Sequence, residues 1–266
     1  MLNPQQWSGA QGVKKFLSHF YNQSSYTIDR RTLRDVDNFS INPFNSDENE
    51  IGLALNFRNT FSFNRGKQKY TTTYTYLSNE ATNLLSTGLQ ESSLQSHQLT
   101  FLHKIRESWL FNMQSEIGST GSNAENFPSR NFKIGNYGIN PKVSYLFNTQ
   151  SRVSLFYEFQ DKENTLGARE SLAQQNLGIA FAISDVEKLS LTGEFKYVDN
   201  RFRGNAFSPV AYQLLEGLQP GTNYTWTLIA QKRLTKFLDV NVSYFGRKSE
   251  SSQTIHTGNV QLRAFF

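Results

Sequence analysis

The chain has 266 residues, of which 37% are hydrophobic, and its mean hydropathy of −0.54 is too low for the runs of about 18 apolar residues that form transmembrane helices. It contains no cysteine, which excludes disulfides, thiolate metal sites and thiol catalysis. The net charge of +5 comes from Lys and Arg residues scattered among Asp and Glu, so we expect no nucleic-acid partner.

The first residues of the chain show no clear period. Trp7, Val13 and Phe16 are interspersed with Lys14 and Lys15, which fits either a short amphipathic helix or the tail of a preceding strand. No basic segment followed by an apolar segment is present here, so these residues encode no secretory signal. We expect residues 1–22 to be an N-terminal extension or the tail of a preceding element, and the chain to be a mature or truncated portion of a longer exported protein.

Most of the remaining chain alternates between apolar and polar residues. Residues 23–31 form the first such segment, and about eleven more follow. They are centred on residues 51–63, 70–76, 99–105, 109–113, 143–147, 153–159, 177–183, 189–197, 224–228, 238–244 and 257–266. Alternation with period two is typical of strands that have one apolar and one wet side.

An antiparallel transmembrane β-barrel explains this repetition best. Segments of about ten residues are long enough to cross a bilayer at the tilt of a barrel strand, and a closed barrel keeps the polar side chains on its inner face. The aromatic content of 14% fits rings at the two membrane interfaces better than it fits a soluble β-sandwich. We therefore predict an all-β fold over residues 23–266, with about 12 strands, or the C-terminal part of a larger barrel.

The connections between the segments alternate in length. Short turns are predicted at residues 64–68, 106–107, 148–151, 184–188 and 234–236, and longer polar loops at 78–96, 118–130, 161–171 and 200–222. Outer-membrane barrels have short periplasmic turns and long external loops, so we expect the C-terminus to lie in the periplasm. Pro141 interrupts one segment and predicts a bulge or an external strand extension there.

The last strand carries the most specific pattern. Gly258, Val260, Leu262, Ala264 and Phe266 share one face. This strand resembles the closing strand of bacterial outer-membrane β-barrels, in which such a terminus acts as an assembly signal. The resemblance implies that Val260, Leu262, Ala264 and Phe266 form this signal, and that removal of Phe266 reduces membrane assembly.

The C-terminal sixty residues carry a broader resemblance. Residues 212–221, 224–226, 246–250 and 260–266 resemble the C-terminal β-barrel region of large uncharacterised Gram-negative outer-membrane proteins. The resemblance implies a barrel anchor in the bacterial outer membrane and no particular activity. Its implied partners are outer-membrane lipid and the barrel-assembly machinery, with periplasmic or surface protein subunits as further candidates.

No residue pattern reaches the strength of a catalytic or metal-binding motif. The four histidines, His19, His97, His103 and His256, lack metal-ligand spacing. His103 shares a face with Leu99, which indicates a membrane-interface residue. His256 could approach the serines of residues 249–252, but no acidic partner stands out. Asp47, Glu48 and Glu50 could ligate a cation, although a solvated loop is the simpler interpretation. We expect no enzyme activity, no cofactor and no metal.

The polar sides of the strands carry charges of both signs. We predict that these charges line the lumen: Arg58, Lys104, Lys142, Glu158, Glu194, Lys196, Asp239, Arg247 and Arg263. The leading hypothesis is an outer-membrane β-barrel that serves as a membrane anchor or a narrow or plugged channel of a larger envelope protein. Two alternatives remain open: the C-terminal part of an energised outer-membrane ligand transporter, and a hydrolase with its site at the barrel rim.

Overall fold

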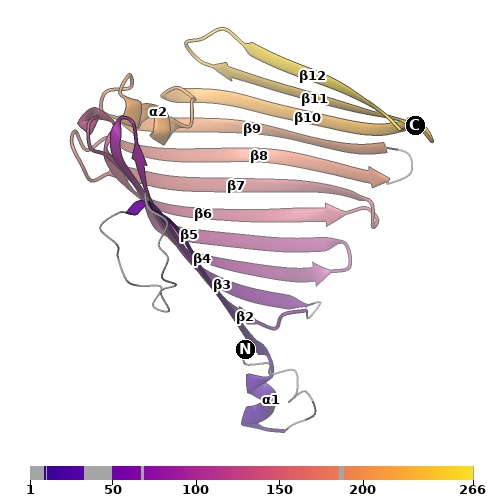
Figure 1. The fold of residues 1–266 in the computed structure, drawn as a ribbon. Coiled ribbons are helices and arrows are strands. Elements are labelled where there is room, and N and C mark those ends of the chain that lie inside the picture. The colour runs from indigo at the N-terminus through magenta and orange to yellow at the C-terminus, as the bar shows by residue number, and fades with distance from the viewer. Residues whose placement is uncertain (1–8, 10, 33–49, 67–68, 186–188, 266) are drawn as a thin grey trace.

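One antiparallel sheet of twelve strands makes up most of the chain in the computed structural model (Figure 1). The structure describes residues 9, 11–32, 50–66, 69–185 and 189–265. The strands are β1 (Phe20–Thr32), β2 (Glu50–Phe63), β3 (Tyr70–Leu85), β4 (Gly88–Arg106), β5 (Trp109–Ala124), β6 (Phe132–Leu146), β7 (Ser151–Asn164), β8 (Ser171–Asp185), β9 (Leu189–Arg203), β10 (Gly221–Thr235), β11 (Leu238–Ser249) and β12 (Ile255–Ala264). Each strand pairs with the next one along the chain. The predicted fold class is confirmed, and residues 23–31 belong to the first strand.

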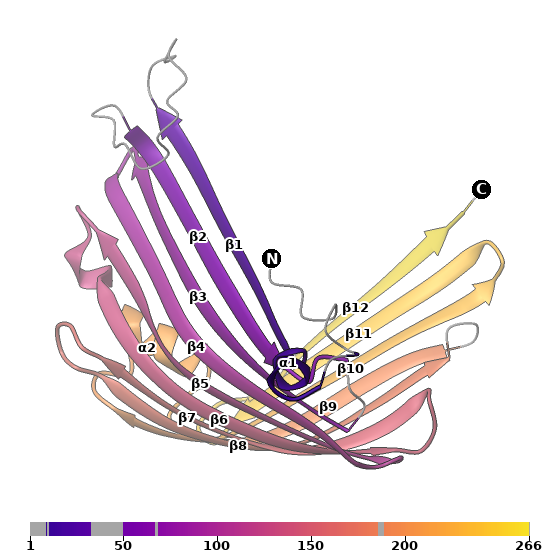
Figure 2. The same cartoon turned by 90° about the horizontal axis from the view of Figure 1, so that it is seen from below.

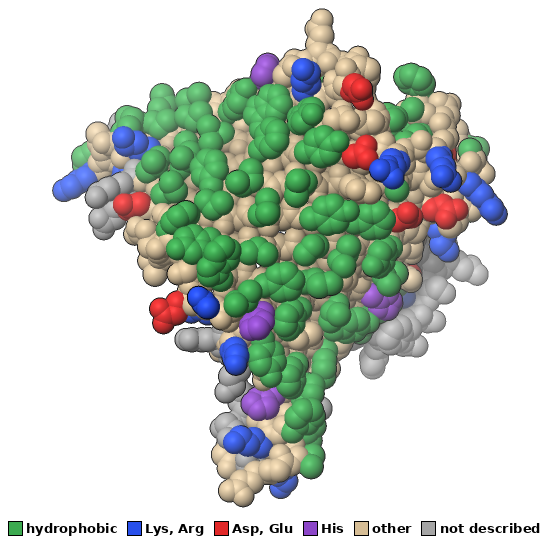
Figure 3. Space-filling model, turned by 180° about the vertical axis from the view of Figure 1, so that it is seen from behind, with side chains coloured by type: hydrophobic (Ala, Val, Ile, Leu, Met, Phe, Trp, Pro, Cys, Tyr) green, Lys and Arg blue, Asp and Glu red, His purple; other side chains and the backbone are tan. Residues whose placement is uncertain are grey.

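The two faces of the sheet differ in chemistry, as the alternation predicted. Facing residues on paired strands share a face, so the register follows each face across the sheet. The row Leu155, Ile179 and Phe195 lies on the convex face, where these side chains are 57%, 49% and 44% exposed. Figure 3 shows hydrophobic side chains covering this face. The concave face carries Ser154, Gln174 and other polar side chains. An apolar outer face and a polar inner face are those of a barrel wall in a bilayer.

The sheet is bent into a trough whose two rims are β1 and β12 (Figure 2). Within the described part of the chain, β1 pairs only with β2 and β12 pairs only with β11. Every residue of β12 is exposed. Two edge strands therefore present unpaired backbone N–H and C=O groups, which the hydrocarbon core of a bilayer does not tolerate.

The predicted short turns lie where β2, β4, β6, β8 and β10 end, although residues 67–68 and 186–188 of two of these turns lie outside the described residues. Two of the predicted long loops are wrong in extent. β3 runs to Leu85 and β4 begins at Gly88, so residues 78–96 are the outer part of a hairpin and not a loop. β5 continues to Ala124, so the first half of the loop predicted at 118–130 is strand. Both faces of these strand ends are polar, and the alternation that marks a half-buried strand is missing there.

The bulge predicted at Pro141 is absent from β6. Pro141 lies opposite Met113 of β5 in an uninterrupted register. On the β7 side the pairing omits Asn140 and Pro141 and resumes at Lys142, opposite Phe156, without a register shift. The missing proline N–H thus removes pairing locally and leaves the strand path unchanged.

Two short α-helices and one 3-10 helix, η2 (Pro128–Arg130), accompany the sheet among the described residues. α1 (Val13–Leu17) precedes β1, and its Phe16 ring lies 5.1 Å from the ring of Phe20. α2 (Pro209–Leu215) interrupts the connection between β9 and β10 and lies inside the trough (Figure 2). The loop predicted at residues 200–222 therefore contains a helix that the sequence did not predict. No helix among the described residues is long and apolar enough to cross a membrane.

Candidate functional site

Helix α2 is defined at both ends by local chemistry. The Ser208 hydroxyl accepts a hydrogen bond from the Ala211 N–H at 3.0 Å, and Pro209 occupies the first turn, where no N–H partner is needed. Glu216 ends the helix in a left-handed conformation with φ of 53°, and Gly217 follows with φ of 76°. A helix of seven residues is not stable alone, so its position depends on what it packs against.

The apolar face of α2 packs on the concave face of the sheet. The buried cluster consists of Ile134, Leu172, Val210, Ala211, Leu214 and Leu215, with Phe132 and Phe202 packed against it. Leu214 and Ala211 are fully buried. This cluster forms nearly all of the buried hydrophobic core among the described residues, with Phe156 and Val198 as the other members. The helix is therefore held in the trough by the hydrophobic effect.

Polar contacts fix the chain that follows α2. The Lys162 ammonium of β7 lies 2.5 Å from the Glu216 carboxylate, and Arg247 of β11 donates to the Gly217 carbonyl at 3.0 Å. The side chains of Asn200 and Asn223 donate to the Gln219 carbonyl at 3.0 and 2.8 Å. Residues on β7, β9, β10 and β11 thus hold one segment against the wall.

Glu170, in the loop between β7 and β8, contacts Ser208, the residue that precedes α2. The residue is 4% exposed, and its carboxylate accepts hydrogen bonds from the Asn164 amide at 2.9 Å and from the Ser208 hydroxyl at 3.2 Å. Burial disfavours the charged form. Hydrogen bonds from Asn164, from its own backbone N–H and from Ser208 outweigh burial and hold the pKa of this carboxyl below its ordinary value. The negative charge is thus stabilised where α2 begins.

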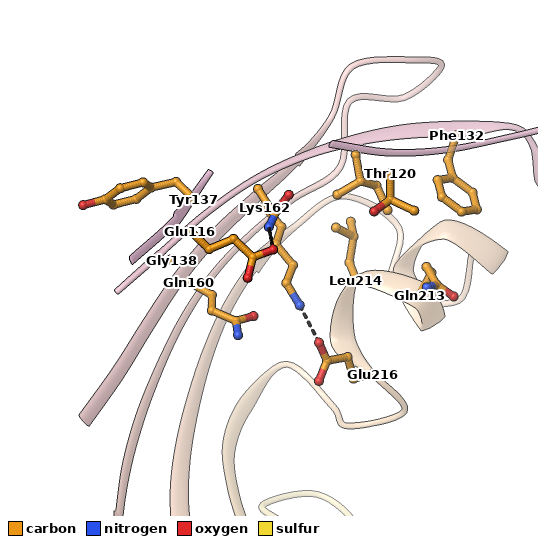
Figure 4. Close-up of a pocket in the computed structure, with 12 residues that line it drawn as sticks. Glu116, Thr120, Phe132, Tyr137, Gly138, Gln160, Lys162, Gln213, Leu214 and Glu216 are labelled. Carbon is orange, nitrogen blue, oxygen red and sulfur yellow. Dashed lines mark hydrogen bonds and ion pairs between the residues drawn. The ribbon is translucent and has the colours of Figure 1, made fainter. Parts of the chain in front are cut away.

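A pocket of about 310 Å³ opens between α2 and strands β5, β6 and β7 (Figure 4). Glu116 and Gln160 line its wall side, and Gln213 and Leu214 face them from the helix. Lys162 extends between the two sides to Glu216. The pocket is bounded by the connection between β9 and β10 on one side and by strands on the other.

The lining of this pocket favours a solute that donates hydrogen bonds. Glu116 accepts from Ser96 at 3.0 Å and from Asn136 at 3.5 Å. The Gln160 amide donates to Glu158 at 2.6 Å, and its buried carbonyl oxygen has no partner among the described residues. Two carboxylates, several amides and one lysine fit a polar ligand that is neutral or cationic.

The nine charges predicted for the lumen, Arg58, Lys104, Lys142, Glu158, Glu194, Lys196, Asp239, Arg247 and Arg263, all occupy register positions on the face that α2 covers. Lys196 pairs with Glu194 at 2.9 Å, and Asp239 pairs with Arg233 at 3.5 Å. Lys162 and Glu116 belong to the same face but were not among the predicted lumen charges, although Lys162 alternates in step with Glu158 of the same strand.

The residues proposed for other roles lie elsewhere. Val260, Leu262 and Ala264 share the convex face of β12, and Phe266 lies outside the described residues. His256 is also on the convex face, where its Nδ1 lies 2.8 Å from the Tyr244 hydroxyl. Asp47 and Glu48 lie outside the described residues, as does the side chain of Glu50. The described residues contain no group of three or more His, Cys, Asp or Glu side chains that could hold a metal ion.

Comparisons with known proteins identify the fold and no sequence family. No protein-family model matches the sequence, and no curated protein sequence matches it. Among solved structures, the siderophore receptor PirA from Pseudomonas aeruginosa aligns with a TM-score of 0.55 and 7% identity, over 93% of this chain and 40% of the receptor. The chain therefore spans well under half of that receptor's length.

Two autotransporter domains align less closely. The β domain of the Bordetella autotransporter BrkA matches with a TM-score of 0.39 and 6% identity, over 93% of this chain and all of that domain. The translocator domain of NalP from Neisseria meningitidis matches with a TM-score of 0.31 and 12% identity, over 98% of this chain and 94% of that domain. The fold therefore defines a class of structure: this chain is a twelve-stranded antiparallel sheet that resembles the wall of outer-membrane β-barrels.

Proposed function

We propose that the chain forms part of the wall of a larger outer-membrane barrel that takes up a ligand, with its concave face lining the passage. The observation that carries this proposal is the open sheet. Twelve strands curve into a trough whose edges, β1 and β12, are unpaired among the described residues. Because unpaired edges are unstable in hydrocarbon, further strands are needed to complete the wall.

The size of the matched receptor supports this proposal. The chain aligns with 40% of the siderophore receptor, and the alignment covers nearly all of this chain. A sheet that follows part of a wider wall has a gentler curvature than a sheet that closes on itself with the same strand number. The identity of 7% carries the fold alone, so the ligand of this chain is argued from its own residues.

The pocket beside α2 is the proposed ligand contact of this wall. In our proposed orientation the short turns and the C-terminus are periplasmic, which puts α2 near the external end of the passage. Glu116, Gln160 and Gln213 would then meet a solute as it enters. The connection that contains α2 would then narrow the passage.

The other hypotheses have less support. A narrow channel or anchor of twelve strands requires β1 to pair with β12, and these strands lie at opposite rims (Figure 2). A rim hydrolase requires a nucleophile beside a histidine. His256 contacts Tyr244 on the convex face, whereas the Ser249 hydroxyl donates to Asn223 on the concave face. We therefore propose a role in transport without catalysis.

The experiment that tests the proposal is the mass of the polypeptide that carries this sequence in outer membranes. An antibody raised against residues 204–220 should detect, in the outer-membrane fraction of the source bacterium, a protein much heavier than 30.5 kDa. Disruption of its gene should reduce uptake of a ligand on which growth depends. A band at 30.5 kDa that forms a pore by itself would overturn the proposal.

A further inference from the structure

A second hollow lies on the concave face, nearer the short turns than α2. Its volume is about 290 Å³, and its lining includes Lys142, Arg152, Ser154, Ala180, Thr192 and Glu194. This volume is at the lower end of the range of small-molecule sites. No residue of the hollow belongs to the pocket beside α2.

The register explains why a hollow forms here. Gly178, Ala180 and Ala182 succeed one another on the concave face of β8. Phe156 of β7 lies opposite Gly178, and its ring fills the space above this glycine, where a Cβ atom would overlap it. Ala180 lies opposite Ser154 of β7, and both Ala180 and Ala182 line the hollow. The small side chains of β8 are therefore the floor of a depression between the longer side chains of β6, β7 and β9.

The rim of this hollow carries positive charge that the protein does not neutralise. Lys196 pairs with Glu194 at 2.9 Å. Lys142 and Arg152 have no ion pair among the described residues. The Lys142 ammonium lies over the Phe156 ring, with its Nζ 5.9 Å from the ring centroid. The three ionic side chains that line the hollow, Lys142, Arg152 and Glu194, carry a net charge of +1, and Lys196 offsets the charge of Glu194 from outside the lining. Two unpaired cations beside a depression raise the local concentration of anions.

We propose that this hollow binds a small anion that carries carboxylate or phosphate groups. An arginine guanidinium presents two parallel N–H donors that match a carboxylate or phosphate, and a lysine adds a point charge. The hydroxyl groups of Thr192 and Thr227 supply further donors at its edge. A recessed floor of alanines fits a solute of limited size, whereas a protein surface would lie across the rim without filling it.

This inference rests on one element of the proposed function, namely that the concave face is in contact with water. The polypeptide that carries this chain is isolated from outer membranes in a neutral detergent, and binding of citrate and of inorganic phosphate is measured by calorimetry at low ionic strength. We expect at least one anion to bind and its affinity to fall as salt is added. Tighter binding of citrate assigns the site to carboxylates, and tighter binding of phosphate assigns it to phosphates.

Variants locate the site. Lys142→Gln and Arg152→Gln should each weaken binding about tenfold, as expected for loss of a hydrogen bond to a charged group. Lys142→Arg, which keeps the charge, should bind nearly as well as the unmodified protein. Arg152→Lys keeps the charge but loses the paired donors, so it should weaken binding less than Arg152→Gln does. Arg263→Gln removes a cation from β12 on the same face, far from the hollow, and should leave binding unchanged.

Two results would overturn the inference: neither anion binds, or both glutamine variants bind as tightly as the unmodified protein while remaining folded. Resistance to unfolding by detergent on a gel reports the folded state of each variant. Anion binding does not depend on how the barrel closes, so failure here would leave the proposal of a larger wall standing. Failure of the larger wall would, conversely, leave the measured affinity unchanged.

Discussion

The Lys162 ammonium on β7 and the Glu216 carboxylate at the end of α2 lie 2.5 Å apart, although 54 residues separate them in the chain. Lys162 is mostly buried, with its side chain 14% exposed, whereas Glu216 is 60% exposed. The pair joins β7 to the connection between β9 and β10. It also forms one side of the pocket beside α2 (Figure 4).

Loss of this ion pair should loosen α2 only slightly. Because Glu216 is largely exposed, Lys162→Met should cost at most about 1 kcal/mol of local stability. Hydrogen exchange followed by mass spectrometry should show a small increase in the exchange rate of residues 209–215. Arg201→Gln breaks an ion pair with Asp199 on the convex face and should not change this rate. Complete loss of protection in Lys162→Met would show that the pair, and not the apolar cluster, holds the helix.

The apolar cluster should contribute more. Leu214 is fully buried between α2 and the wall, so Leu214→Ala should destabilise the docked helix by about 2–5 kcal/mol. The same hydrogen-exchange measurement should show residues 209–215 exchanging nearly as fast as an exposed loop. Tyr212→Ala is the matched control, since this side chain of the same helix is 72% exposed. Equal effects of the two changes would refute the packing described for α2.

Acid should release the start of α2 through Glu170. The pKa of this carboxyl is lower in the folded protein than its ordinary value of 4.5, so the stabilisation is fully present above pH 4.5. It is lost as the pH falls below 4.5 through the lowered pKa, because the protonated group no longer accepts both hydrogen bonds. Pepsin, which is active in acid, should cleave residues 204–220 faster relative to other sites as the pH decreases.

Glu170→Gln provides the control for this pH dependence. At pH values above 4.5 the variant should be cleaved faster than the unmodified protein, because an amide cannot replace the carboxylate at Ser208 and Asn164. The two proteins should converge at the acidic end of the range. A constant ratio of cleavage rates at all pH values would contradict the role given to the ionised carboxyl.

The packing of β11 against β10 should require a glycine at position 246. Gly246 lies opposite Trp226 of β10, and a Cβ atom at Gly246 would overlap the indole ring. Gly246→Val should therefore destabilise the sheet by about 1–3 kcal/mol through overpacking. Gly258→Val, on the convex face of β12 with nothing within 4 Å of its added Cβ, should have little effect. The urea concentration at the midpoint of unfolding is measured for both variants. Equal midpoints would count against the packing of Trp226 over Gly246.

Alternation in the sequence predicted the strands because each one is polar on one side only. Ile179 and Leu155 mark the convex face as clearly in the sequence as in the register. The same signal failed at residues 78–96, where β3 and β4 extend with polar residues on both faces. It also failed for α2, since seven residues are too few to establish a helical period, although Ser208 and Pro209 are typical of a helix start.

The pocket beside α2 and the openness of the sheet were beyond sequence reasoning for a different reason. Alternation assigns the faces of each strand but contains no information on which strands meet at the edges. Lys162 and Glu216 come together only because the connection between β9 and β10 folds back into the trough. Such contacts depend on tertiary packing of Leu214 and Leu172, which no local pattern encodes.

The most direct test of the larger wall is disulfide formation between β1 and β12 in intact outer membranes. The chain has no cysteine, so every disulfide reports a designed pair. Asn241→Cys with Gln261→Cys, which face each other across β11 and β12, is the positive control and should cross-link. Ser25→Cys or Thr27→Cys combined with Asn259→Cys or Gln261→Cys should not cross-link. Cross-linking of any of these β1–β12 pairs as efficient as that of the control would contradict the account, because the twelve strands would then close on themselves.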